Sequence, residues 1–150
     1  MKQLRTLSLA LLALFAFAVT APAQGKPGWL TDIKQAKEQA SADKKLIVVD
    51  FTGSDWCGWC IKLDREVFSK PEFKEYADKN LVLLEVDFPK RKELPAAQKA
   101  HNMELAEKYG VQGFPTIIVL NGEGKVVGEL GYMPGGASAF LAELDKLRKG

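Results

Sequence analysis

The stretch WCGWC at residues 56–60 contains both cysteines of this 150-residue chain and separates them by two residues. Residues 46–51 before it, LIVVDF, form a β-branched apolar run of strand length, and residues 61–68 after it can continue as a helix. The pair therefore lies where a strand passes into a helix. Because a helix N-terminus carries unpaired backbone N–H groups and the positive end of the helix dipole, it stabilises a thiolate. This position predicts two thiols that cycle as one disulfide.

The same cysteines allow two other interpretations. A structural disulfide is common in exported proteins, but a bridge that closes so short a loop removes little entropy from the unfolded chain. For zinc, Cys57, Cys60 and the only histidine, His101, supply three ligands, and no second cysteine pair or histidine cluster completes a tetrahedral site. The sequence therefore favours a redox pair, and we expect no metal.

The first residues have the features of a secretory signal peptide. Lys2 and Arg5 precede an apolar run at residues 7–19, and Ala21-Pro22-Ala23 provides small residues for cleavage. The run has 13 residues, fewer than the roughly 20 that a membrane-spanning helix needs. We therefore expect residues 1–23 to be removed and residues 24–150 to form one domain, periplasmic or secreted.

The charge of the chain belongs largely to this signal segment. It holds two of the 21 basic residues and none of the 19 acidic residues, so the rest of the chain has no formal net charge. This balance gives no indication of nucleic acid as a partner.

Hydrophobic periodicity predicts alternating helices and strands. The apolar run at residues 81–88 indicates a strand that is covered on both faces and parallel to residues 46–51. Ser69 and Glu72 have the spacing of a capping box that opens a helix ending near Lys79. The other predicted elements are helices at about 29–42, 61–68, 95–109 and 136–148, and a hairpin of strands at 115–120 and 125–130 with its turn at 121–124.

Several short motifs resemble those of thioredoxin-like proteins. They occur in the family's order as Val49-Asp50-Phe51, WCGWC at 56–60, Tyr109-Gly110-Val111, Gly113-Phe114-Pro115-Thr116 and Gly131. The combination is specific because Phe114 opens a predicted hairpin 54 residues after Cys60. The resemblance covers almost all of residues 24–150. Within the family, the chain is similar to the exported thiol-disulfide oxidoreductases of bacteria. The resemblance implies an α/β, three-layer fold with a central mixed sheet of about four strands flanked by helices, and it implies no cofactor.

The resemblance also implies a substrate-binding surface around the cysteines. Pro115 is expected to be a cis proline beside the pair, with Phe114 offering its backbone to an extended peptide. We expect core packing to explain most of Trp56, whereas Trp59 either contacts apolar substrate or packs on its own surface loop. The expected substrate-binding residues are Trp56, Gly58, Trp59, Phe114, Pro115 and Thr116.

The chain departs from the family pattern at three places. Asp50 lies seven residues before Cys57, where the family usually has six. The lysine that the family commonly places on the next strand is replaced by Leu83, so Asp50 is expected to lack a partner for proton transfer. About ten extra residues fall within 88–103, most simply as a surface insertion.

The helix position assigns unequal roles to the two cysteines. Cys57 is expected to be the exposed thiolate that attacks a substrate disulfide, and Cys60 the more buried thiol that resolves the mixed disulfide. Asp50 is expected to accept the proton of Cys60. Gly58 and Trp59 tune the potential, and the sequence leaves the direction of electron flow open.

The function predicted from these features is an exported, monomeric thiol-disulfide oxidoreductase that reduces or isomerises protein disulfides. Its expected partners are cysteine-containing exported proteins, and family analogy implies a membrane thiol-electron transporter as the source of electrons. The alternative is a peptide-binding or chaperone module on the same fold, in which the Cys57–Cys60 disulfide is mainly structural.

Overall fold

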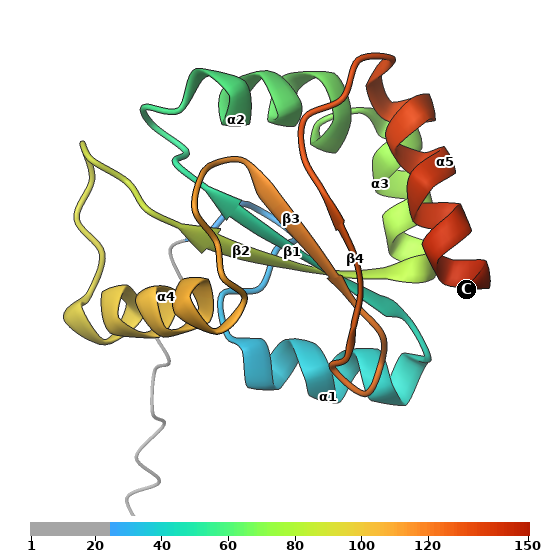
Figure 1. Ribbon diagram of the computed structural model, residues 1–150, viewed down its shortest axis with the longest axis horizontal. Coiled ribbons are helices and arrows are strands. Elements are labelled where there is room, and N and C mark those ends of the chain that lie inside the picture. Colours follow the sequence, from blue (N-terminus) through green and yellow to red (C-terminus); the bar gives the residue numbers. More distant parts are fainter. Residues whose placement is uncertain (1–24) are drawn as a thin grey trace, which may run out of the picture.

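The computed structural model describes residues 25–150 and shows a four-stranded sheet between two layers of helices (Figure 1). The predicted signal peptide lies outside the described residues. The strands are β1 (Leu46–Thr52), β2 (Leu81–Asp87), β3 (Thr116–Leu120) and β4 (Val126–Leu130). The helices are α1 (Ile33–Asp43), α2 (Gly58–Leu63), α3 (Pro71–Asn80), α4 (Ala96–Lys108) and α5 (Gly136–Lys149), and α2 continues into a π-helical turn, η1 (Asp64–Phe68). The expected three-layer α/β architecture is confirmed.

The strands lie in the order β2-β1-β3-β4. β1 pairs in parallel with β2, as the apolar pattern predicts, and places Asp50 opposite Glu85. β3 is antiparallel to both β1 and β4, so the sheet is mixed and the last two strands form the expected hairpin. The central strand β1 is buried along its entire length, which explains its continuous β-branched sequence.

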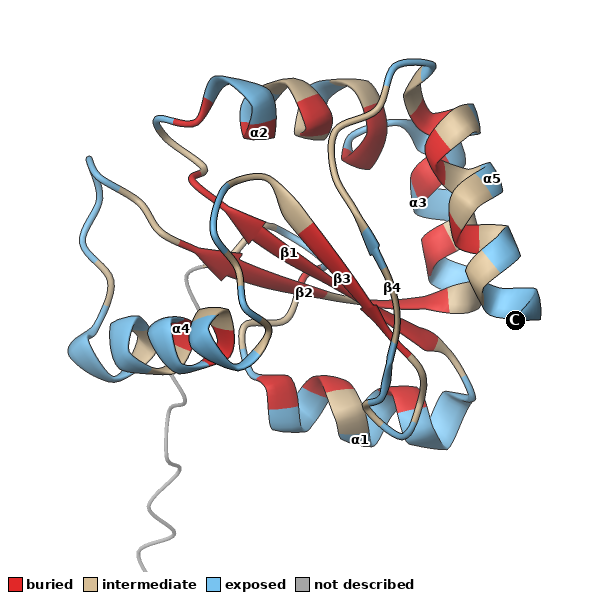
Figure 2. Ribbon diagram, viewed as in Figure 1, coloured by how far each residue is buried: buried red, intermediate tan, exposed pale blue. Residues whose placement is uncertain are grey.

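Each face of the sheet has its own hydrophobic core, and buried residues line both (Figure 2). Successive side chains of β1 point to opposite faces, so Val48 packs in one core and Val49 in the other. α2 with η1, α3 and α5 cover the first face, where Phe73 and Phe140 are fully buried. α1 and α4 cover the second face, mainly through Ile33, Ala36, Ala40 and Leu105.

Two of the expected helix starts are wrong. The Ser69 capping box does not form, because Ser69 ends η1 and its hydroxyl donates to Asp64 at 2.9 Å. α3 instead begins with Pro71 in its first turn and Lys70 in the capping position. α1 begins at Ile33 rather than near Trp29, because the Asp32 side chain accepts the first free backbone amides of the helix.

The residues before α1 lie along the outer edge of β2 instead of extending the helix. The Leu30 amide donates to Leu83 O at 2.8 Å, and the Glu85 amide donates to Leu30 O at 2.9 Å. The Glu85 carboxylate also accepts the backbone amide of Lys26 at 3.1 Å. This short parallel pairing brings the start of the described chain beside the sheet end that carries Asp50.

Candidate active site

The two cysteines occupy the N-terminus of α2 and form a disulfide. Cys57 is the capping residue, with extended backbone, and its Sγ accepts a hydrogen bond from the Cys60 amide at 3.3 Å. The Cys57 amide donates to Gly53 O at 2.9 Å, which closes the linker between β1 and α2. An amide directed at Sγ at a helix N-terminus stabilises negative charge on that sulfur. The strand-to-helix position inferred from the sequence is therefore confirmed.

The expected difference in exposure between the cysteines is absent in this oxidised state. Cys57 is 7% exposed and Cys60 is 5% exposed, so both are buried. The Phe114–Pro115 peptide bond is cis, as the family motif implied. Phe114 O lies 3.7 Å from Cys57 Sγ, so this loop covers the sulfur that was expected to be open to solvent.

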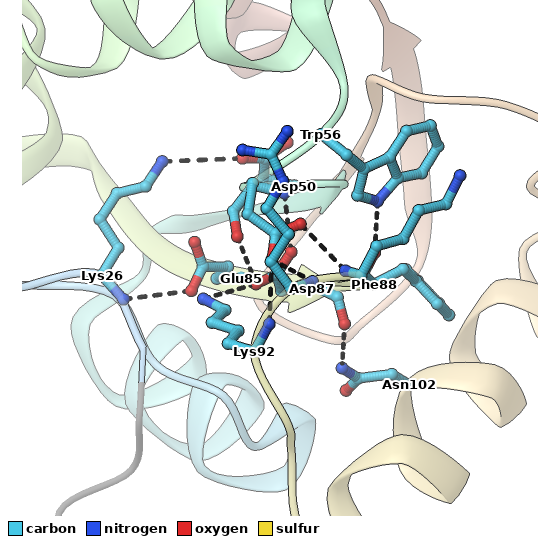
Figure 3. Close-up of polar contacts among 12 residues, drawn as sticks. Lys26, Asp50, Trp56, Glu85, Asp87, Phe88, Lys92 and Asn102 are labelled. Carbon is cyan, nitrogen blue, oxygen red and sulfur yellow. Dashed lines mark hydrogen bonds and ion pairs between the residues drawn. The ribbon is translucent and has the colours of Figure 1, made fainter.

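Trp56 lies beside the cysteines but outside the core, which corrects the expectation that core packing explains it. The side chain is 37% exposed, and its Nε1 donates to Phe88 O at 2.7 Å (Figure 3). Its ring lies against Phe114 with the centroids 6.1 Å apart. The ring also covers Gly53 so closely that a Cβ there would lie 2.5 Å from it. Trp56 therefore joins the linker, the cis-proline loop and the segment after β2.

Trp59 packs on a neighbouring ring while most of its side chain stays exposed. It is 58% exposed, yet its ring packs on Tyr132 with the centroids 4.9 Å apart, and Lys62 lies over both rings. Gly58 is exposed as the first residue of α2. Thr116 opens β3, and its hydroxyl donates to Gly113 O at 2.7 Å. The residues that precede each cysteine, Trp56 and Trp59, thus both carry exposed rings.

Four polar residues are buried where β1 and β2 end nearest to the cysteines. Along one face of these strands, the apolar Val48 and Leu83 give way to the paired positions Asp50 with Glu85 and Thr52 with Asp87. Glu85 and Asp87 are 4% and 5% exposed. The segment before α1 covers Glu85, and Ser54 and Lys92 contact the carboxylate of Asp87.

Burial raises the pKa of Asp50 to about 7. Lys26 opposes this rise, whereas the carboxylates of Glu85, Asp64 and Asp87 add to it. Burial also raises the pKa of Glu85, partly offset by the backbone N–H and the charge of Lys26. A carboxyl that titrates near neutral pH can accept and return a proton there.

Lys26 is the site residue that the sequence interpretation missed. Its ammonium lies 3.8 Å from Asp50 Oδ2 and 2.6 Å from Asp64 Oδ1 (Figure 3 shows the Asp50 contact). The rings of Trp29 and Phe68 lie 4.4 and 5.0 Å from the same Nζ. The expectation that Leu83 leaves Asp50 without a cationic partner is therefore wrong. Only the alternation of apolar and acidic residues along β2 signalled a polar cluster, and nothing in it pointed to Lys26.

A small cavity connects this cluster with the resolving cysteine. Its volume is about 160 Å³, enough for several water molecules. Lys26, Glu85 and Cys60 all line it, so Cys60 and the polar cluster share one cavity. The other lining residues are Thr52, Ser54, Ile61 and Asp64. Within residues 25–150, no group of three or more His, Cys, Asp or Glu side chains is placed to hold a metal ion.

The extra residues after β2 are hydrogen-bonded to the linker between β1 and α2. The Asp55 carboxylate accepts the backbone amides of Lys90, Arg91 and Lys92 at 2.9, 2.8 and 3.2 Å. These hydrogen bonds lower the pKa of Asp55, and the one from Lys90 has the largest effect. Ser54 binds the Asp87 carboxylate through both its amide and its hydroxyl. The insertion thus packs against the residues that directly precede Cys57.

Comparison with known proteins agrees with this geometry. The sequence profile of the family described as a thioredoxin-like domain matches residues 33–148. The chain belongs to the thioredoxin-like family. Within this family, the chain is 39% identical over 115 residues to a protein of Chlamydia pneumoniae named disulfide bond reductase DsbH. The aligned region covers 77% of this chain and 69% of that protein. A solved structure of a DsbH oxidoreductase has a TM-score of 0.75 at 35% identity, covering 86% of this chain and 93% of that one.

Other relatives share only part of their length with this thioredoxin-like chain. The thioredoxin-related protein DsbJ of the same organism is 28% identical over 87% of this chain, which spans 38% of that protein. The thiol:disulfide interchange protein DsbD of Tatumella citrea is 30% identical over 81% of this chain, which spans 19% of it. Together with the Cys57–Cys60 disulfide, these similarities make the protein a protein-disulfide oxidoreductase, as the sequence predicts.

Proposed function

We propose that this protein is an exported reductase of protein disulfides. The observation that carries the proposal is the Cys57 sulfur at the N-terminus of α2, with the Cys60 amide directed at it. This contact favours a thiolate on Cys57 and makes it the attacking group. The reductive direction is supported by the name of the DsbH relative.

The two cysteines perform the reaction in sequence. Cys57 attacks one sulfur of the substrate disulfide, which forms a mixed disulfide and releases the other sulfur as a thiolate. Cys60 then attacks Cys57 Sγ, the protein disulfide closes, and the second substrate sulfur leaves. The pair of electrons passes from the protein dithiol to the substrate, and Asp50 accepts the proton that Cys60 loses.

The surface around the disulfide supports peptide binding. Phe114 contributes its carbonyl beside Cys57, and the exposed rings of Trp56 and Trp59 supply apolar contact. Gly58, Pro115 and Thr116 complete the proposed surface. An extended peptide that carries a disulfide could lie between the two rings.

Export through residues 1–23 and recharging by a membrane thiol-electron transporter belong to the same proposal. The DsbD relatives named as thiol:disulfide interchange proteins support such an electron source. Within residues 25–150, none of the helices has the length and apolar character needed to cross a membrane. The proposed clients are exported proteins that contain cysteines.

Single-turnover reduction of a fluorescent peptide disulfide tests the assignment of the cysteines. Cys60→Ser should trap a mixed disulfide on Cys57 that mass spectrometry detects, and Cys57→Ser should abolish both reduction and trapping. The double variant controls for background reduction. If Cys57→Ser retains full activity in aiding the refolding of a reduced client, the protein is a binding module with a structural disulfide and the proposal fails.

The reductive direction has its own measurement. The redox potential of the Cys57–Cys60 pair, obtained in glutathione buffers, should lie well below the glutathione poise. A potential well above that poise would identify an oxidant instead.

A further inference from the structure

We propose that Lys26 is a positioning residue for proton transfer from Cys60, acting through Asp50. This inference rests on the proposed function. The charge of Lys26 favours the ionised carboxylate of Asp50, which is the form that can accept a proton when Cys60 attacks the mixed disulfide.

The placement of Lys26 is built into the fold. Its backbone amide is bound by Glu85 at 3.1 Å, and the following residues pair with the edge of β2 through Leu30. The ammonium is then held by Asp50, Asp64 and the rings of Trp29 and Phe68, with 25% of the side chain exposed. A lysine fixed at both its backbone and its charged end keeps one position relative to Asp50.

Lys26 also lies on the side of Asp50 that faces the chemistry. It lines the cavity of about 160 Å³ that Cys60 also lines, whereas Asp50 is not among the lining residues and is 3% exposed. The lining includes the polar side chains of Lys26, Asp64 and Glu85, and the cavity is large enough for water, so water in it can carry a proton from Cys60 toward the carboxylate. Lys26 thus contacts both this cavity and the carboxylate of Asp50.

The proton balance of the resolving step defines what Lys26 must do. Cys60 forms a bond with Cys57 Sγ, the bond between Cys57 and the substrate breaks, and the substrate sulfur leaves with the electron pair of that bond. The proton of Cys60 passes to Asp50, and from there it can return to solvent or to the departing thiolate. Asp50 can take part only when ionised, which the neighbouring carboxylates of Asp64, Glu85 and Asp87 oppose and the ammonium of Lys26 favours.

The test is the pH profile of resolution in the exported protein. Reduced protein is mixed rapidly with excess peptide disulfide between pH 5 and 9 and quenched with acid, and mass spectrometry counts the mixed disulfide and the oxidised protein. Lys26→Met should move the midpoint of the resolution rate upward by about one pH unit. The rate at pH 7 should fall roughly five- to tenfold and recover at pH 9, and the rate of Cys57 attack should not change.

Two further variants give matched controls. Lys26→Arg keeps the charge and should restore most of the rate at pH 7. Lys34→Met removes a lysine from the exposed side of α1 and should leave the profile unchanged. An identical profile for Lys26→Met and the unmodified protein, or equal losses in Lys26→Met and Lys26→Arg, would overturn the proposal.

Asp64→Asn keeps the proposal testable should Lys26→Met fail to fold. Asp64 competes with Asp50 for Lys26 from the protein surface, so its removal should move the midpoint downward. A midpoint that stays in place or rises contradicts the proposed role. A failure of the proposed function looks different, because the unmodified protein would then form no mixed disulfide that Cys60 resolves.

Discussion

The burial of Asp50 affects both the proposed proton transfer and the stability of the fold. Asp50 lies on the central strand, and burial raises its pKa from 3.8 to about 7 although Lys26 is nearby. Between these values the native protein holds a proton at Asp50 that the unfolded chain has released. The free energy of unfolding therefore falls as the pH rises through this window. The residue that serves the proposed proton transfer also lowers stability at neutral pH.

Asp50→Asn should accordingly stabilise the protein at higher pH. We expect the free energy of unfolding to rise by roughly 2–4 kcal/mol above pH 7 and to change little below about pH 3, where both states hold the proton. Urea unfolding at several pH values measures this difference. The same variant should slow the resolving step.

The exposed Asp43 at the end of α1 provides the control, because Asp43→Asn removes a carboxyl that is not buried. A gain for Asp50→Asn that is the same at pH 4 and pH 8 would show that the carboxyl does not titrate between them.

At the scale of elements, the two segments that are longer than the family pattern contact each other. The linker between β1 and α2 carries the extra residue, and the segment after β2 carries the insertion. Asp55 of the linker binds three consecutive amides of the insertion, and Lys90 returns to cover the Trp56 ring at 3.8 Å. Asn102 of α4 fixes the base of the insertion by donating to Asp87 O at 2.8 Å (Figure 3). Each insertion supplies the binding partners of the other.

Asp55→Ala should therefore free the insertion without unfolding the protein. We expect the amides of Lys90, Arg91 and Lys92 to exchange hydrogen about tenfold faster, because each loses a charged acceptor. Hydrogen exchange followed by mass spectrometry reports on this segment.

Glu93→Ala is the matched control, since it removes a carboxylate of the same insertion that contacts the Lys99 side chain and no backbone amide of the insertion. Equal exchange rates in the two variants would show that Asp55 does not hold the segment.

Over the whole molecule, the sheet separates two cores, and the core beneath α2 supports the polar cluster. There the aromatic rings of Phe68, Phe73 and Phe140 pack edge-to-face or tilted, with centroids 5.0 to 6.3 Å apart. Phe68 also lies below the Lys26 ammonium. The packing of α5 and α3 thus supports η1 and, through it, the polar cluster.

Phe140→Ala tests this support. The cavity left by a fully buried ring should lower the free energy of unfolding by about 3–5 kcal/mol. Chemical denaturation of the oxidised protein measures the change. Met103→Ala removes a side chain that is 65% exposed and should cost less than about 0.5 kcal/mol. Similar losses for both variants would contradict the packing described.

The local sequence predicted the secondary structure and the position of the redox pair. Strand and helix periodicity, the cysteine spacing and the Phe114-Pro115-Thr116 motif act over short distances along the chain, so each can be recognised without knowledge of the fold. The helix starts at Ser69 and Trp29 were mistaken, because Ser69 binds Asp64 of the preceding turn and the residues before Asp32 pair with the edge of β2.

Only the tertiary structure decided the surroundings of Asp50. Lys26 and Glu85 are 59 residues apart in sequence, and no periodic pattern relates them. Their contact depends on the segment before α1 pairing with the edge of β2, an interaction between main-chain groups that side-chain patterns do not encode. The same pairing buries the acidic end of β2. The sequence therefore identified the redox cysteines, whereas the fold determined which charges surround Asp50.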